Sequence, residues 1–180
     1  MDRIRRVTTG HDANGRAAVI ADEKVDPLTL SLLPGFETIE LWHTDHTPKM
    51  PEMLGGPGAP NYFPAPGGTV FRVVTFPPDS GGMASPEFDF TAALAEAQDK
   101  VPALVAKLEP DNPGMHATDS VDYGIVLEGE LDLELDDGAF TTIGVGTVVI
   151  QRGTRHAWRN RGELPARVAF ILVGAGSDTT

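Results

Sequence analysis

The sequence predicts an all-β fold, either a closed barrel or a double-sheet jelly roll, and three observations carry this prediction. From residue 115 onward, short segments rich in β-branched and apolar residues follow one another at close intervals. The turns between them are tight, as at Asp136-Asp137-Gly138, which is a hairpin signal. Glycine and proline are abundant, with 20 and 15 residues in a chain of 180. Many short strands joined by tight turns are typical of these two architectures.

The clearest strand runs from Glu130 to Leu135. Its acidic residues alternate strictly with leucines, so the acidic side chains share one face and the leucines share the other. We expect the acidic row of Glu130, Asp132 and Glu134 to face solvent and the three leucines to be buried. Similar patterns predict further strands at 17–21, 37–43, 69–76, 124–127, 140–143, 147–150, 156–159 and 166–173.

One helical segment and one long loop precede the strand-rich part. Residues 91–108 have helical composition: Thr91 can cap a helix there, and Pro102 should kink it or divide it into two short helices. Residues 47–68 hold six prolines and five glycines without strand or helix periodicity, so they form a loop. Its apolar side chains favour packing onto a barrel mouth or onto a partner subunit.

The chain is predicted to form one domain, since 180 residues suffice for one well-filled core and are few for two. Residues 1–113 contribute N-terminal strands, the Pro/Gly-rich loop and the short helix, packed with the barrel. Residues 114–174 form the main part of the barrel, and residues 175–180 form a loose tail.

Composition argues against several classes of partner. A formal net charge of −12 without a Lys/Arg cluster argues against nucleic acid and anionic membrane surfaces. No apolar run reaches the roughly 20 residues that span a bilayer, and the N-terminus lacks the apolar segment of a signal peptide, so we expect a cytoplasmic protein. The chain has no cysteine, which leaves imidazole and oxygen ligands for any metal.

Four residues have the spacing of a metal site on a β scaffold. His116 and Thr118 are two apart, so on a strand their side chains share one face. Asp122 can reach that face from the next segment, and His156 opens a later strand. Two imidazoles and one carboxylate form a set that leaves positions open for water, dioxygen or substrate. We therefore predict His116, Asp122 and His156 as metal ligands and catalytic residues, with Fe, Mn, Zn or Ni as the metal.

A substrate pocket is expected around these ligands. Thr118 can hold a ligated water, Gln151 can present its amide, and Trp158 lies two residues beyond His156, where it can form an apolar wall. The alternative for Trp158 is plain core packing. The alternative for the whole site is a metal-free barrel whose two histidines only form hydrogen bonds.

The motifs around these residues resemble the two sequence motifs of the cupin superfamily, G-x5-H-x-H-x3/4-E-x6-G and G-x5-P-x-G-x2-H-x3-N. In this chain they read His116-x-Thr118-x3-Asp122-x6-Gly129 and Gly146-x4-Gln151-x-Gly153-x2-His156-x3-Asn160. The first motif has threonine for the second histidine and aspartate for glutamate. The second has glutamine for proline and is one residue shorter. The resemblance covers residues 114–174 and implies a cupin jelly-roll β-barrel.

The resemblance implies a small single-domain cupin, whose metal is usually held by three histidines and one glutamate. Carried over by position, that set leaves His116, Asp122 and His156. The family is compatible with oxygenase, isomerase, decarboxylase, cyclase or lyase chemistry on a small organic molecule of carbonyl, enol or aromatic type. A non-catalytic or metal-free small-molecule-binding cupin is the alternative, which Thr118 favours. A homodimer is also expected, in which the long loop and the first strands bury against the neighbour.

Overall fold

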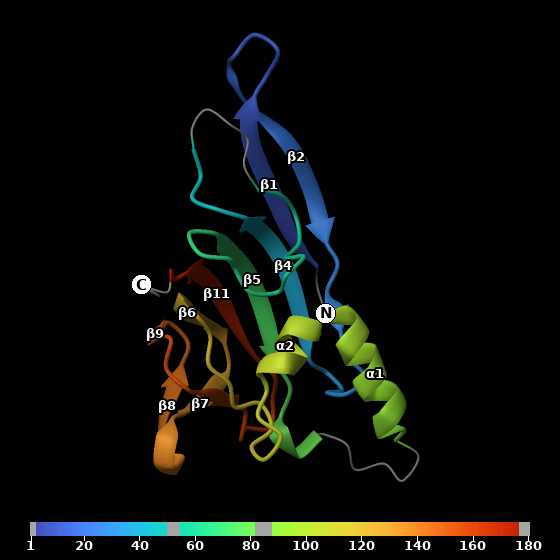
Figure 1. Ribbon diagram of the computed structural model, residues 1–180. Helices are drawn as coiled ribbons and strands as arrows, with labels where there is room; N and C mark the ends of the chain where they lie inside the picture. Colours follow the sequence, from blue (N-terminus) through green and yellow to red (C-terminus); the bar gives the residue numbers. More distant parts are fainter. Residues whose placement is uncertain (1–2, 50–54, 82–87, 177–180) are drawn as a thin grey trace.

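The protein is built mainly of β-strands, which form three sheets (Figure 1). The computed structural model describes residues 3–49, 55–81 and 88–176. The largest sheet has the strand order β3-β4-β5-β11-β6-β9, the second has β10-β7-β8, and the third is the hairpin β1-β2, all antiparallel. The strands are β1 (Ile4–His11), β2 (Ala17–Val25), β3 (Leu28–Thr29), β4 (Glu37–Thr44), β5 (Thr69–Phe76), β6 (Ser120–Glu128), β7 (Glu130–Glu134), β8 (Phe140–Gly144), β9 (Val148–Arg152), β10 (Ala157–Arg159) and β11 (Ala166–Gly174). The helices are α1 (Phe90–Lys100) and α2 (Pro102–Lys107), with short 3-10 turns η1 (Asp79–Gly81) and η2 (Asp136–Gly138).

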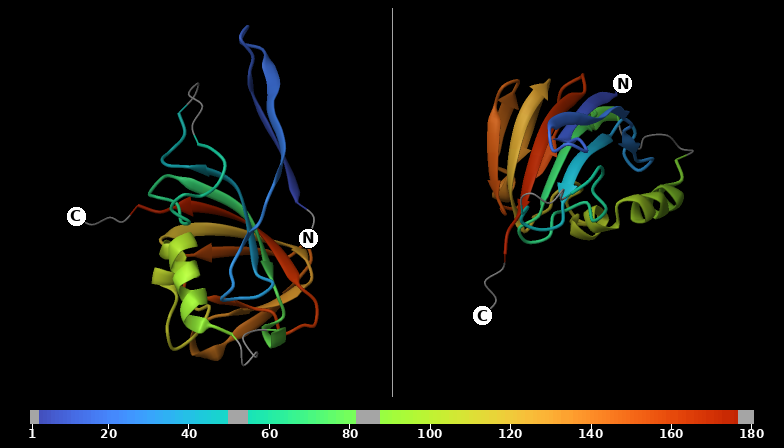
Figure 2. Two further views of the ribbon diagram at one scale, coloured as in Figure 1. Left: turned by 90° about the vertical axis from the view of Figure 1, so that its right-hand side faces the viewer. Right: turned by 90° about the horizontal axis from the view of Figure 1, so that it is seen from above.

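The main core lies between the six-stranded and the three-stranded sheet, and we call this space the barrel interior (Figure 2). Its buried side chains come from both sheets and from the helices, and include Val70, Val126, Val168, Phe170, Leu172, Leu131, Ile143, Ala97 and Val101. The two sheets are separate in their hydrogen bonding. The predicted all-β cupin jelly roll with an N-terminal extension and a short helical segment is therefore confirmed, in its double-sheet form.

The helical segment is divided as its proline predicts. Val101 separates the two helices, and Pro102 begins α2, where a missing N–H leaves no intrahelical bond unmade. The predicted cap is wrong. Asp89, not Thr91, caps α1, because its carboxylate accepts a hydrogen bond from the backbone N–H of Ala92 at 3.0 Å.

The acidic row of β7 is not the free solvent face that its alternation predicts. Asp132 is buried and accepts a hydrogen bond from a threonine hydroxyl of β8. Glu134 pairs with Arg159 of β10 at 2.6 Å. Leu135, predicted to be buried, is exposed because the strand ends at the residue before it. The correction arises because β7 is the central strand of its sheet and has partners on both sides.

The N-terminal hairpin contains a strand that the sequence pattern does not predict. No strand is predicted before β2, yet β1 pairs with β2 along its whole length. Polar residues and cross-strand ion pairs such as Arg5 with Asp22 hide its strand periodicity. The hairpin root packs through Ile4 and Val25 against the outer face of the large sheet. The rest of the hairpin projects beyond the barrel (Figure 1 and Figure 2).

The Pro/Gly-rich loop packs onto its own chain. Residues 50–54 of this loop lie outside the described part. Tyr62 belongs to the core, and the ring of Phe63 lies 6.4 Å from that of His116, between centroids. Tyr62 adopts a φ of 58°, a left-handed conformation that non-glycine residues rarely take, so its surroundings must hold it there. Tyr62 and Phe63 therefore pack within their own chain, the first in the core and the second against His116.

Only the first two residues of the predicted C-terminal tail lie in the described part of the chain. Strand β11 runs to Gly174, and residues 177–180 of the predicted loose tail lie outside the described part. Within the described ranges, no helix has the length and apolar character needed to cross a membrane.

Candidate functional site

His116 and His156 lie side by side in the structure. Each backbone N–H donates to the carbonyl of the other, at 3.0 and 2.9 Å. Side chains of directly paired residues point to the same face, and the two ring centroids are 4.5 Å apart. The strand predicted through Thr118 is wrong, since this pairing is an isolated bridge and regular pairing starts at Ser120. The two imidazoles nevertheless meet, as the predicted site requires.

Backbone carbonyls fix the tautomer of both imidazoles. Nδ1 of His116 lies 2.9 Å from the carbonyl oxygen of Gly114, and Nδ1 of His156 lies 2.9 Å from that of Thr154. A carbonyl oxygen only accepts hydrogen bonds, so each Nδ1 carries the proton and donates it. Each Nε2 therefore keeps its lone pair available for a proton or a metal ion.

Burial keeps both imidazoles neutral. His156 is 3% exposed, and its burial lowers its pKa to about 4, although its bond to the Thr154 carbonyl acts in the opposite direction. The pKa of His116 is also lowered, chiefly by burial, against the raising effects of the Gly114 carbonyl and of Asp122. At neutral pH the site thus offers two uncharged nitrogen donors.

We expect the free energy of unfolding to rise with pH between about 4 and 6.5. His156 has a folded pKa of about 4 against an ordinary 6.5, so in this window the unfolded chain binds the proton and acid favours unfolding. At ~1.4 kcal/mol per pH unit, this contribution is about 3 kcal/mol, fully present above the window. Asp122 offsets part of this gain in stability. Its pKa is raised in the folded protein, so its contribution to the free energy of unfolding falls as pH rises.

Urea unfolding of the wild type and of His156→Gln measures this effect. Glutamine can still donate to the carbonyl of Thr154 but does not titrate, so the variant should have a flatter dependence of stability on pH. Equal slopes in the two proteins would contradict the assignment to His156.

Asp122, the third predicted ligand, lies on β6 with two hydroxyl groups around its carboxylate. Ser120 Oγ donates to Oδ1 at 2.5 Å, and Thr118 Oγ1 donates to Oδ2 at 3.3 Å. Burial raises the pKa of Asp122, whereas these hydroxyls, His116 and Arg72 act in the opposite direction. Ser120 is not among the predicted site residues, although its place two residues before Asp122 on the same face of the strand indicates it.

The fit to a metal ion is good for the histidines and incomplete for the carboxylate. Metal-ligating histidines usually donate their other ring N–H to a carbonyl or carboxylate, as His116 and His156 do. Asp122 is near enough for its charge to act on His116. However, the described residues contain no group of three or more His, Cys, Asp or Glu side chains placed to hold a metal. The structure therefore brings the two imidazoles together but does not place Asp122 with them as a third ligand.

The other predicted pocket residues take different places. Gln151 is buried directly opposite Asp122 in the β6–β9 ladder, and its Oε1 accepts a hydrogen bond from Thr154 Oγ1 at 2.8 Å. Its amide nitrogen has no hydrogen-bond partner, so it is an unused donor in this region. Trp158 stacks on Phe76 with ring centroids 6.1 Å apart and packs against the core. Its ring also lies 6.2 Å from that of His156, between centroids, so Trp158 packs against both the core and the histidine pair.

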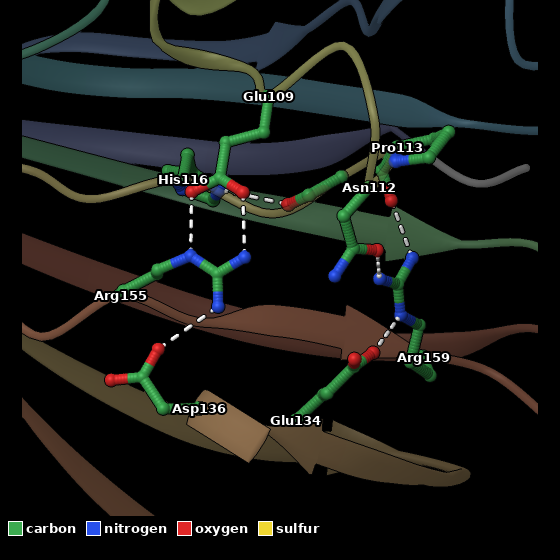
Figure 3. A network of polar contacts seen from close by, with 9 residues as sticks. Glu109, Asn112, Pro113, His116, Glu134, Asp136, Arg155 and Arg159 are labelled. Carbon is green, nitrogen blue, oxygen red and sulfur yellow. Dashed lines mark hydrogen bonds and ion pairs between the residues drawn. The ribbon is translucent and has the colours of Figure 1, made fainter. Parts of the chain in front are cut away.

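Two arginines hold the segment that leads into His116 (Figure 3). Arg155 bonds Glu109 twice at 2.6 Å and Asp136 at 2.9 Å, and Arg159 bonds Glu134 and Asn112 at 2.6 Å and the Pro113 carbonyl. Arg155 lies two residues before β10, and Arg159 is the last residue of β10. These contacts therefore tie the segment before His116 to the strand after His156. The arginine–carboxylate bond of Arg155 spans 46 residues, so no local sequence pattern indicated it.

A buried ion pair, Arg72 with Glu40, lies on the interior face of the large sheet. Arg72 is 3% exposed, and Phe170, its cross-strand neighbour, belongs to the core. Arg72 Nε lies 3.3 Å from Glu40 Oε2. Its guanidinium covers the ring of Tyr62 at 3.7 Å and donates to the Tyr62 carbonyl. Burial raises the pKa of Glu40, and Arg72 acts against this.

A cavity of about 440 Å³ borders Glu40 rather than the histidine pair. It lies among β2, β4 and the loop at Pro57–Gly58, with charged side chains along its wall. The cavity and the imidazoles are therefore separate features of the molecule.

The two separate sheets and the histidine pair agree with the cupin jelly roll that the sequence motifs imply. Residues 105–173 match the family described as Cupin domain. This range includes His116, Asp122 and His156. This part of the chain is therefore similar to the cupin family, and the comparisons support a small cupin domain.

Individual relatives match either the motif region or most of the chain. Phomopsin biosynthesis cluster protein C' of Diaporthe leptostromiformis is 48% identical over 62 residues, 34% of this chain and 33% of that protein. The chain thus matches about a third of the length of this relative. A cupin-domain-containing oxidoreductase of Aspergillus ruber is 28% identical over 96% of this chain and 73% of that protein. Among solved structures, the cupin domain of Schizosaccharomyces pombe Cnp3 has a TM-score of 0.46 at 11% identity, covering 100% of this chain and 99% of that one.

Proposed function

We propose that the protein is a metal-dependent cupin enzyme acting on a small organic molecule in the barrel interior. The observation that carries the proposal is the pair of neutral imidazoles, each with Nδ1–H bound to a carbonyl and Nε2 free. With His116 and His156, Asp122 would form a 2-His-1-carboxylate set, since each of its oxygens keeps a lone pair beside its hydroxyl bond. The fold does not select the reaction. The oxidoreductase name of the Aspergillus ruber relative favours the oxygenase class among those open to the family.

The surrounding residues have distinct roles in this proposal. A divalent Fe, Mn, Zn or Ni ion would supply Lewis acidity toward a carbonyl, enol or aromatic-type oxygen. The amide nitrogen of Gln151 donates to a substrate oxygen, because it is buried without another partner. Thr118 and Ser120 orient the carboxylate of Asp122 through their hydroxyls. Phe63 covers His116 at the barrel mouth and limits the access of water.

Metal analysis of protein purified without a histidine tag tests the proposal. We expect about one equivalent of a transition metal, removable by EDTA, with thermal stability restored by the ion that is native to the site. Asp122→Asn should weaken metal binding while the fold is kept, because asparagine retains the volume and loses the charge. Less than ~0.1 equivalent of metal, with no stabilisation by Fe(II), Mn(II), Ni(II) or Zn(II), would overturn it.

A metal-free cupin is the second candidate, and the lack of a three-ligand group among the described residues favours it. In this case the free Nε2 of His116 or His156 acts as a general base, and activity follows pH but is insensitive to EDTA. A non-catalytic barrel would bind the same class of small molecule without turnover. Assays of the EDTA-treated and the metal-replete protein separate these functions. A metal-free enzyme is equally active in both forms, and a non-catalytic barrel is active in neither.

A further inference from the structure

The buried side chain of Gln151 carries a hydrogen-bond donor that no described residue uses. Gln151 is 4% exposed, and its amide nitrogen Nε2 has no hydrogen-bond partner within the described ranges. Most buried polar groups in folded proteins are hydrogen-bonded, and one that is not calls for an explanation such as a role in binding. Because Gln151 lies directly opposite Asp122 in the β6–β9 ladder, the two side chains share the interior face of the sheet.

Thr154 determines which end of this amide is free. Its hydroxyl Oγ1 donates to Gln151 Oε1 at 2.8 Å, so the amide oxygen is occupied and the amide nitrogen is the free end. The backbone carbonyl of Thr154 also accepts the Nδ1 hydrogen of His156 at 2.9 Å. Thr154 lies in the connection between β9 and β10, three residues after Gln151 and two before His156. One residue therefore orients both the amide and the imidazole.

The acceptors on the same interior face are already in use. The two carboxylate oxygens of Asp122 accept hydrogen bonds from Ser120 and Thr118. In the proposed function, the remaining lone pairs of Asp122 and those of the two imidazoles bind the metal ion. A ligand hydroxyl would bring a hydrogen that finds no acceptor among these groups, and an unpaired buried donor destabilises the complex. A carbonyl oxygen only accepts, so it satisfies Gln151 Nε2 without adding a donor.

We propose that the barrel interior binds its ligand through a carbonyl oxygen, which accepts a hydrogen bond from Gln151 Nε2, and that Thr154 is the positioning residue for this donor. The inference rests on the proposed function and deepens it, because it narrows the carbonyl, enol and aromatic-type molecules to carbonyl compounds. Gln151 touches the ligand, whereas Thr154 acts through Gln151 and His156.

Nuclear magnetic resonance of the side-chain amides tests this contact. The chain has only two glutamines, so a sample isotope-labelled in glutamine shows two side-chain amides, those of Gln151 and Gln98. Gln98 is exposed on α1 and is the internal control. Acetone, a small neutral carbonyl compound, should shift the Gln151 signal and leave that of Gln98 nearly unchanged, in both the EDTA-treated and the Zn(II)-loaded protein. No shift at Gln151, or equal shifts at both glutamines, would overturn the proposal.

Isopropanol separates this inference from the proposed function, because it has the carbon skeleton of acetone with a hydroxyl in place of the carbonyl. In the Zn(II)-loaded protein, acetone should bind more tightly than isopropanol, since the ion occupies the acceptors that the hydroxyl hydrogen needs. The preference should disappear after EDTA treatment. A response of Gln151 to acetone without any metal-dependent preference would contradict the metal site and still support the contact with Gln151.

Variants at two positions identify the donor and the residue that orients it. Gln151→Met has a similar volume without the donor, and its affinity for acetone should fall about 3- to 10-fold, the usual effect of one hydrogen bond between neutral groups. Thr154→Val should lose as much, because the amide can then turn, whereas Thr154→Ser keeps the hydroxyl and should bind like the wild type. Backbone amide signals of β6 and β9 measure the affinity in every variant. Equal affinities in Thr154→Val and Thr154→Ser would exclude the positioning role, and unchanged affinity in Gln151→Met would exclude the donor.

Discussion

Replacing either histidine of the barrel pair should abolish metal retention. His116→Ala or His156→Ala removes one of two neutral nitrogen donors whose rings lie 4.5 Å apart. We expect metal affinity to fall by more than about 100-fold. Removing a residue that only hydrogen-bonds to a metal ligand typically lowers affinity by ~10- to 100-fold, and the loss of a ligand itself should cost more. The buried His156→Ala should also lose about 1–3 kcal/mol of stability, because it leaves a cavity and an unpaired carbonyl at Thr154. Free imidazole should partly restore metal binding to this variant by filling the vacated space.

His43→Ala is the matched control for these variants. His43 Nδ1 lies 3.0 Å from the carbonyl oxygen of Gly58, so it makes the same kind of hydrogen bond away from the pair. Its replacement should leave the metal content unchanged. Elemental analysis with thermal unfolding measures both quantities in each protein. Metal retained by His156→Ala, or lost equally from His43→Ala, would exclude the pair as the site.

Local spacing was sufficient to predict the parts of the site that depend on short stretches of chain. The short motifs placed His116 and His156 together correctly, although an isolated bridge between their backbones brings them together and not a regular strand. Thr118 and Asp122 do interact, as their shared motif indicates. The strand assignment at His116 failed, because a single bridge to His156 replaces a regular ladder there.

The parts that could not be predicted depend on pairings between distant segments. Arg155 meets Glu109 across 46 residues, and neither residue stands out in its own segment. The hairpin strand β1 is polar because its side chains pair with β2, so apolar periodicity could not reveal it. The sequence indicates Arg72 only weakly, as a charged residue between apolar residues of β5. Its contacts with Glu40 and Tyr62 are set by the three-dimensional fold.

Arg72→Met should destabilise the protein by about 3–5 kcal/mol, the usual cost of removing one partner of a buried ion pair. The change leaves Glu40 buried without its counter-ion and removes the donor to the Tyr62 carbonyl. Tyr62 is held at a φ of 58°, so its loop should loosen and release Phe63 from His116. Arg152→Met, which removes an exposed arginine from β9, is the control and should have little effect.

The pH dependence and a double variant separate charge from packing in this result. Burial already raises the pKa of Glu40, and without Arg72 it should rise further. A raised carboxyl pKa favours folding at low pH, so Arg72→Met should lose stability relative to the wild type as pH increases. Arg72→Met/Glu40→Leu should recover much of the loss, because no buried charge then lacks a partner. Denaturant unfolding of the three proteins measures this, and a double variant no more stable than Arg72→Met would show that the guanidinium acts by packing against Tyr62 and not by pairing with Glu40.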